Sequence, residues 1–159
     1  MHSPYLCPMR FDQYALAPEI KRNLEALGFK RPTDIQFKAI PPILKGEDLL
    51  AIAQTGTGKT AAFVIPILQL LHERKTSART AGIRCIVWAP TRELALQLTG
   101  VFEQIGAHTR VSTFCVFGGV EQGPQIARLQ SGIDILVSTP GRLFDLASQG
   151  FIDLDKVEF

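Results

Sequence analysis

A phosphate-binding turn is the strongest chemical signal in the sequence. Residues 53–60 read AQTGTGKT. Glycines in such a turn let backbone N–H groups face phosphate oxygens, the lysine adds positive charge, and the threonine hydroxyl can bind Mg²⁺. Ala53 stands where many of these turns have a first glycine. The residues expected to hold a nucleotide are Gln54, Thr55, Gly56, Thr57, Gly58, Lys59 and Thr60. Among them, Lys59 and Thr60 are the catalytic candidates, and Thr60 is the candidate metal ligand.

A second stretch, residues 28–36 (GFKRPTDIQ), has a structural and a chemical interpretation. Thr33 and Gln36 have the spacing of a capping box, in which each side chain bonds the backbone of the other at a helix start. A glutamine amide can also hydrogen-bond an adenine edge in two places, and Phe29 could add a stacking face. The two interpretations are compatible, because a cap can hold an adenine-binding residue in place.

Two further stretches place an arginine at the start of a predicted helix. In residues 90–97 (PTRELALQ), Thr91 is a candidate cap and Arg92 a nearby positive charge. Residues 139–142 (TPGR) repeat this pattern, with Thr139 as the cap and Arg142 in the first turn. Helix N-termini attract anions, but for residues 90–97 alone a capped helix with a surface arginine is the favoured explanation. In residues 139–142 an arginine in the first turn works against the helix dipole, so an anionic partner is a reasonable explanation.

These stretches, with a Gly-Gly pair, could line one track for a phosphodiester backbone. Glycines allow a close approach of the chain to a ligand, and phosphate contacts give affinity without sequence information. The candidate backbone-binding residues are Pro90, Thr91, Arg92, Gly118, Gly119, Thr139, Pro140, Gly141 and Arg142.

The elements that would position these residues alternate between strands and helices. Apolar runs predict strands at 48–53, 84–89, 112–117 and 134–138. Helices are expected at 18–27, at about 33–44, after the phosphate turn, at about 92–107, at about 122–130 and from Pro140 onward. Strands that are apolar on both faces are typical of buried parallel sheets. We therefore predict an α/β fold with a doubly wound, mostly parallel sheet flanked by helices. Ligands bind such sheets at the carboxyl ends of the strands.

Composition limits the classes of protein that fit. A chain of 159 residues with a net charge of +2 suits one compact core, and its charge alone does not indicate nucleic acid. Cys7, Cys85 and Cys115 have no metal-ligand spacing, which favours the reducing cytoplasm. The longest apolar run is too short to cross a membrane. Residues 1–10 are expected to form a flexible tail before a domain at 11–159.

The order of these stretches resembles the first RecA-like domain of a DEAD-box RNA helicase over residues 11–159. The resemblance implies that Gln36 binds adenine, with Phe29 and Phe11 holding or supporting the base. It implies ATP and Mg²⁺ as cofactors and RNA as a partner, contacted through its backbone. In that family Ala is also usual at the position of Ala53.

The resemblance also places the Asp-Glu-Ala-Asp motif directly after the last residues, 153–159 (DLDKVEF). We therefore expect a domain that is incomplete at its C-terminus and binds without hydrolysing ATP or unwinding RNA. Asp153 and Asp155 are poor substitutes as metal ligands, because they precede the strand rather than end it. An open sheet edge predicts self-association. Two alternatives stay open: an RNA- or partner-binding module without turnover, and another P-loop NTPase or kinase.

Overall fold

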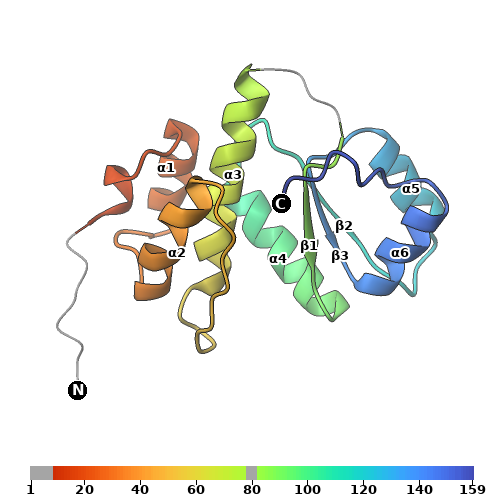
Figure 1. The fold of residues 1–159 in the computed structure, drawn as a ribbon, viewed down its shortest axis with the longest axis horizontal. Coiled ribbons are helices and arrows are strands. Elements are labelled where there is room, and N and C mark those ends of the chain that lie inside the picture. Colours follow the sequence, from red (N-terminus) through yellow and green to blue (C-terminus); the bar gives the residue numbers. More distant parts are fainter. Residues whose placement is uncertain (1–8, 78–81) are drawn as a thin grey trace. The chain divides into compact units, whose positions relative to one another are not determined.

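The structure is a computed structural model that describes residues 9–77 and 82–159 (Figure 1). The chain divides into two compact units. One comprises Met1–Leu70 with Gln104–Thr109, and the other comprises Leu71–Glu103 with Arg110–Phe159. Most of the predicted tail lies outside the described residues, and the single domain predicted over residues 11–159 stays a prediction.

The first unit is helical. It contains a 3₁₀ turn η1 (Phe11–Gln13), helices α1 (Pro18–Ala26) and α2 (Asp34–Leu44), and the first part of α3 (Lys59–Ser77). Pro18 begins α1 because a proline at the first helical position loses no hydrogen bond. Thr33 and Gln36 form the predicted capping box at the start of α2. Fully buried residues of this unit include Ile20, Leu24, Ile40, Val64, Ile65 and Leu68.

The strand predicted at residues 48–53 is wrong, because the structure assigns no strand there. Leu50 is 88% exposed and Ile52 is 89% exposed. A strand exists only where its N–H and C=O groups pair with a neighbour. Within the described residues, no backbone–backbone hydrogen bond is recorded for this segment. Its apolar residues therefore lie in irregular chain without backbone pairing, immediately before the phosphate turn.

The second unit contains a parallel sheet of three strands. These are β1 (Cys85–Trp88), β2 (Thr113–Val116) and β3 (Ile135–Ser138), in the order β1-β3-β2. The central strand β3 is buried at all four positions, as the apolar runs predicted. Phe159 adds a short pairing on the outer edge of β1, where its N–H donates to Arg84 O (3.1 Å) and its carbonyl accepts from Ile86 N (2.9 Å).

Helices cover both faces of this sheet. On one face, Leu136 of β3 packs in a buried cluster with residues of α5 (Gly123–Gln130) and α6 (Pro140–Ser148). On the other face, α4 (Arg92–Ile105) lies close to Cys115 of β2. Figure 1 shows α4 on the side of the strands opposite to α5 and α6. The predicted α/β class, with a parallel sheet flanked by helices, is therefore confirmed.

The two cysteines of this sheet are core residues. Cys85 and Cys115 are both buried with free thiols. Burial raises the pKa of Cys85 to about 12 and also raises the pKa of Cys115, because a thiolate loses its hydration in the interior. Cys7 lies outside the described residues.

A buried ion pair fixes the amino ends of β2 and β3. Asp134 Oδ2 accepts from Lys75 Nζ at 2.7 Å and from Ser112 N at 2.7 Å. Lys75 Nζ also donates to Arg110 O (2.8 Å). The amino ends of the strands are thereby tied together, which leaves the carboxyl ends for the predicted binding residues. No helix in the described ranges is long and apolar enough to cross a membrane.

Candidate functional site

In the first unit, one amide connects the start of α2 to the phosphate turn. Gln36 is only 2% exposed. Its Oε1 accepts from Thr33 N (2.9 Å), and its Nε2 donates to Gly58 O (3.2 Å). A Cβ added at Gly58 would lie 2.5 Å from this Nε2, so any other residue there would require the amide or the turn to shift. The structure thus brings together two stretches that the sequence separates by 22 residues.

The phosphate turn ends at the first residue of α3. Gly56 has φ 81° and Gly58 has φ 85°, a left-handed conformation that glycine adopts without strain. Thr57 Oγ1 donates to Gln54 O (2.7 Å), and Lys59 Nζ donates to Ala53 O. Lys59 and Thr60 occupy the first two positions of α3, where helical N–H groups lack intrahelical acceptors.

Phe11 and Phe29, which the resemblance assigns to the base, contact each other. The rings of Phe11 and Phe29 meet edge to face, with centroids 5.9 Å apart and an interplanar angle of 75°. Phe11 is buried, and Phe11 N donates to Lys30 O (3.4 Å). Both rings line a cavity of about 230 Å³ with charged residues at its rim. Phe11 therefore supports Phe29 and presents little open surface of its own.

In the second unit, the predicted backbone-binding stretches meet at the carboxyl edge of the sheet. β1, β2 and β3 end at Trp88, Val116 and Ser138, which are register partners across the sheet. The segments at 90–92, 118–119 and 139–142 follow these three ends directly. Parallel pairing therefore brings three stretches that lie far apart in the sequence to the same edge of the sheet.

Contacts between side chains join the first two of these stretches. The Arg92 guanidinium lies 4.4 Å from the centroid of the Phe117 ring, directly before Gly118. Arg92 itself is exposed. Thr91 Oγ1 accepts from Leu94 N (3.2 Å), so its predicted cap is present. This arrangement keeps a cation at the surface beside the glycine pair.

The cap predicted at Thr139 is only partly correct. Thr139 occupies the N-cap position of α6 with extended backbone, but its side chain makes no capping bond. Its N–H instead donates to Val116 O (3.4 Å), which continues the pairing of β3 with β2. The first-turn N–H groups of α6 consequently have no side-chain cap, and such groups are available to an anion.

The Arg142 side chain is largely buried at this edge and is only 10% exposed. It donates to the Gln125 amide and to Val120 O. Gln125 was missed in the sequence, although a signal exists. It lies one helical turn before Leu129, and both residues are buried on the same face of α5. A glutamine on an apolar face needs a buried partner.

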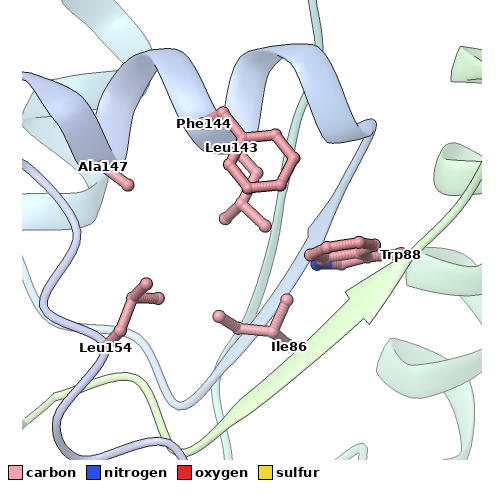
Figure 2. Close-up of a pocket in the computed structure, with 6 residues that line it drawn as sticks. All are labelled: Ile86, Trp88, Leu143, Phe144, Ala147 and Leu154. Carbon is pink, nitrogen blue, oxygen red and sulfur yellow. The ribbon is translucent and has the colours of Figure 1, made fainter.

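A separate apolar cavity of about 380 Å³ lies beside β1 and α6 (Figure 2). Trp88 and Phe144 meet edge to face at its mouth, with centroids 5.5 Å apart. Apart from the Trp88 indole nitrogen, the lining side chains are hydrocarbon: Ile86, Leu143, Phe144, Ala147 and Leu154. The cavity therefore has no charged group that could orient a phosphate.

The donors of the phosphate turn fit a nucleotide better than a metal held by protein alone. Among the described residues, no group of three or more His, Cys, Asp or Glu side chains could hold a metal ion. Asp153 Oδ1 accepts from Asp155 N (3.0 Å) in a local turn. Mg²⁺ usually keeps several waters and binds through substrate phosphates, so one hydroxyl at Thr60 is compatible with it.

Comparison with known proteins finds one kind of relative, namely helicases. A DEAD/DEAH box helicase family model matches residues 33–159. The chain is 41% identical over 149 residues to "ATP-dependent RNA helicase eIF4A" of Lodderomyces elongisporus, covering 94% of this chain and 36% of that protein. It is 44% identical over 151 residues to "DEAD-box ATP-dependent RNA helicase 5" of Oryza sativa, covering 94% and 29%. The chain thus spans about a third of the length of these relatives.

Solved structures agree with the sequence relatives. A DEAD box protein from the hyperthermophile Methanococcus jannaschii has a TM-score of 0.85 and 37% identity, over 94% of this chain and 39% of that one. A hypothetical ATP-dependent RNA helicase from Sulfolobus tokodaii has a TM-score of 0.76 and 39% identity, over 87% and 39%. The predicted RecA-like fold is therefore confirmed. With its family model matched over four-fifths of its residues, the chain belongs to the DEAD/DEAH box helicase family.

Proposed function

We propose that this chain is the adenine-nucleotide- and RNA-backbone-binding part of an ATP-dependent RNA helicase. The observation that carries the proposal is the hydrogen bond from Gln36 Nε2 to Gly58 O. It joins the stretch expected to bind adenine to the turn expected to bind phosphates. An adenine-nucleotide site needs its base-binding and phosphate-binding parts at a fixed separation, and this bond supports that arrangement.

Adenine selection is assigned to the Gln36 amide, with Phe29 supporting the base. An amide offers one donor and one acceptor, which matches the edge of adenine and mismatches the edge of guanine. Because both Gln36 groups already have partners at 2.9 and 3.2 Å, base binding would exchange or share these bonds. Burial of the amide favours a strong preference, since an unmatched base would leave polar groups unpaired.

Phosphate binding is assigned to the turn and its following helix. The N–H groups after Gly56 and Gly58 and the start of α3 face an anion favourably. Lys59 would exchange its bond with Ala53 O for phosphate oxygens. Thr60 would hold Mg²⁺ together with the phosphates, and the ion would neutralise charge on them.

RNA binding is assigned to the carboxyl edge of the second unit. Arg92 supplies the exposed charge, and the glycine pair and the start of α6 supply backbone N–H groups. Contacts of these kinds are with phosphates and sugars, so they favour no base sequence. We further propose a cytoplasmic location, which the free, buried thiols of Cys85 and Cys115 support.

Turnover is not part of this proposal. In the family that the sequence resembles, the carboxylates that hold Mg²⁺ and orient water belong to the Asp-Glu-Ala-Asp motif. These 159 residues do not contain that motif. Phosphoryl transfer depends on such positioned groups. We therefore propose binding without phosphate release by these 159 residues, and an assay for released phosphate tests this directly.

A calorimetric titration with Mg-ADP, repeated with Mg-GDP, tests the nucleotide site. We expect heat from ADP and none from GDP. Equal binding of both would remove adenine selection from Gln36 and favour another P-loop enzyme. Binding of neither would contradict the proposed nucleotide site. Gln36→Glu is the matched variant, because it keeps the size of the side chain and removes its donor. It should lose most of the ADP preference while keeping the helix start.

A further inference from the structure

The amide of Gln125 is fixed at both of its ends. Gln125 is buried on α5. Its Nε2 donates to Phe117 O (3.2 Å), and its Oε1 accepts from Arg142 Nη1 (2.9 Å). A carbonyl needs the donor and a guanidinium needs the acceptor, so only one orientation of the amide satisfies both partners. Gln125 therefore connects the end of β2 to the start of α6.

Arg142 completes the connection from the other side of the glycine pair. Its Nη2 donates to Val120 O (3.0 Å), and its Nε lies 4.0 Å from Asp145 Oδ2. With a side chain only 10% exposed, the guanidinium is directed at the loop and at α6 rather than at solvent. Its charge is thus used within the protein.

The loop held in this way is Phe117–Val120. Its first carbonyl is bound by Gln125 and its last by Arg142, and Gly118 and Gly119 lie exposed between them. A Cβ added at either glycine would meet nothing within 4 Å, so the outer surface of the loop is open. In the part of the chain that the structure describes, neither glycine N–H donates to another backbone group. The loop is thus anchored at both of its ends, and the two exposed glycines between them have no backbone acceptor for their N–H groups.

We propose that Gln125 is a positioning residue for RNA-backbone binding, acting with Arg142 to hold the Gly118–Gly119 N–H groups toward a phosphate. The inference rests on the proposed RNA-binding role of this edge. Arg142 acts here through the loop, and Arg92 is the cation that faces solvent beside it. Hydrogen bonds to a phosphate require donors within a few tenths of an ångström of their working positions, which explains why both ends of the loop are fixed.

A matched control pair lies at the ends of the same two helices, with Gln122 at the N-cap of α5 and Gln149 at the C-cap of α6. Gln122 and Gln149 exchange amide hydrogen bonds at 3.3 and 3.2 Å, which also connect α5 to α6, but neither bond involves the loop. Gln125→Met removes the polar partner while keeping side-chain length. Gln122→Met makes the same change at the control pair. Gln125→Glu keeps the acceptor for Arg142 and loses the donor to Phe117 O.

The test is RNA binding by the full chain, measured by fluorescence anisotropy with a short single-stranded oligouridylate at several salt concentrations. We expect Gln125→Met to weaken binding roughly ten-fold with an unchanged salt dependence, because N–H contacts displace no counterions. The RNA affinity of Gln125→Glu should lie between that of Gln125→Met and that of the unaltered chain. Gln122→Met should bind normally, and Mg-ADP affinity should be unchanged in all three.

Amide NMR shifts of Gly118 and Gly119 separate positioning from loss of folding. Both shifts should move in Gln125→Met and Gln125→Glu while the remaining spectrum stays folded. If the altered chains bind RNA as the unaltered chain does, the inference is overturned and the RNA-binding role stands. If the unaltered chain binds no RNA, the proposed RNA-binding role and the positioning role of Gln125 are both overturned. If Gln125→Met does not fold, the folded Gln125→Glu chain decides, and normal binding by it overturns the inference.

Discussion

The phosphate turn and the carboxyl edge of the sheet reach their geometry by different routes. At the sheet edge, each candidate segment follows a strand that is paired in register with its neighbour. At the phosphate turn, the preceding segment is unpaired and exposes Leu50 and Ile52. The turn instead relies on its glycines and on the bond between Gln36 and Gly58. A binding turn can therefore be held by its glycines and one contact from a distant residue, whereas a binding edge needs a sheet.

The difference predicts that the two regions fail independently. Substitutions near the turn should change nucleotide binding and leave RNA binding intact, and substitutions at the edge should do the reverse. The two functions can be measured separately on one chain, by calorimetry with Mg-ADP and by anisotropy with oligouridylate.

The largest expected effect is that of Lys59→Ala on nucleotide binding. Charge-assisted hydrogen bonds contribute about 1.5–3 kcal/mol, so Mg-ADP affinity should fall roughly 10- to 100-fold. RNA affinity should not change. Lys38→Ala is the control, because Lys38 is an exposed lysine of the same unit that pairs with Asp34. A loss of RNA binding in Lys59→Ala that equals its loss of nucleotide would contradict the independence of the regions.

Gly58→Ala should have the next largest effect, through the bond to Gln36. Gly56→Ala is its matched control, because both positions have positive φ but only Gly58 has Gln36 Nε2 in the path of a Cβ. Left-handed backbone should cost each variant about 1–2 kcal/mol of unfolding free energy. Loss of one hydrogen bond, about 1 kcal/mol, should lower the ratio of ADP to GDP affinity roughly five-fold in Gly58→Ala alone. An equal drop in both variants would separate adenine selection from the Gln36 contact.

These contrasts also explain which features the sequence could predict. Helix α2 was predictable because Thr33 and Gln36 signal its start locally, and α6 because Pro140 follows an apolar strand. The buried parallel strands were recognisable from apolar residues on both faces. Residues 48–53 have the same composition, yet composition does not supply the neighbour that a strand requires.

The candidate site also contains features that neighbouring residues predict and features that depend on how distant elements pack. The phosphate turn is specified by adjacent residues, so its motif was sufficient. The bonds of Gln125 reach 8 residues back and 17 residues forward along the chain, and they depend on how α5 and α6 pack. Nothing near Gln125 in sequence identifies those partners. The inward direction of Arg142 was unpredictable for the same reason, because its partners Gln125 and Val120 lie 17 and 22 residues away in the sequence.

At the sheet edge, Arg92→Ala should weaken oligouridylate binding roughly three- to five-fold and lower the salt slope by about one, as expected when one phosphate contact is lost. Arg128→Ala is a close control. Its guanidinium also lies near an aromatic ring of β2, at 5.7 Å from the Phe114 centroid, but it bonds Ser131 at the end of α5. Mg-ADP affinity should be normal in both. An unchanged salt slope in Arg92→Ala would show that its charge does not face RNA phosphates.

The smallest expected effect concerns the unpaired segment before the phosphate turn. Apolar chain with free N–H and C=O groups favours pairing with another chain. Ile52→Lys should therefore raise the dissociation constant for self-association roughly two- to three-fold, a small change because pairing would be spread over the whole segment. Leu96→Lys alters a single exposed leucine of α4 and should have no effect. Sedimentation velocity over a range of concentrations measures both. If Leu96→Lys reduces association as much as Ile52→Lys does, a general effect of added charge explains both results. The unpaired segment would then be no more prone to pair with another chain than the paired edge of the sheet.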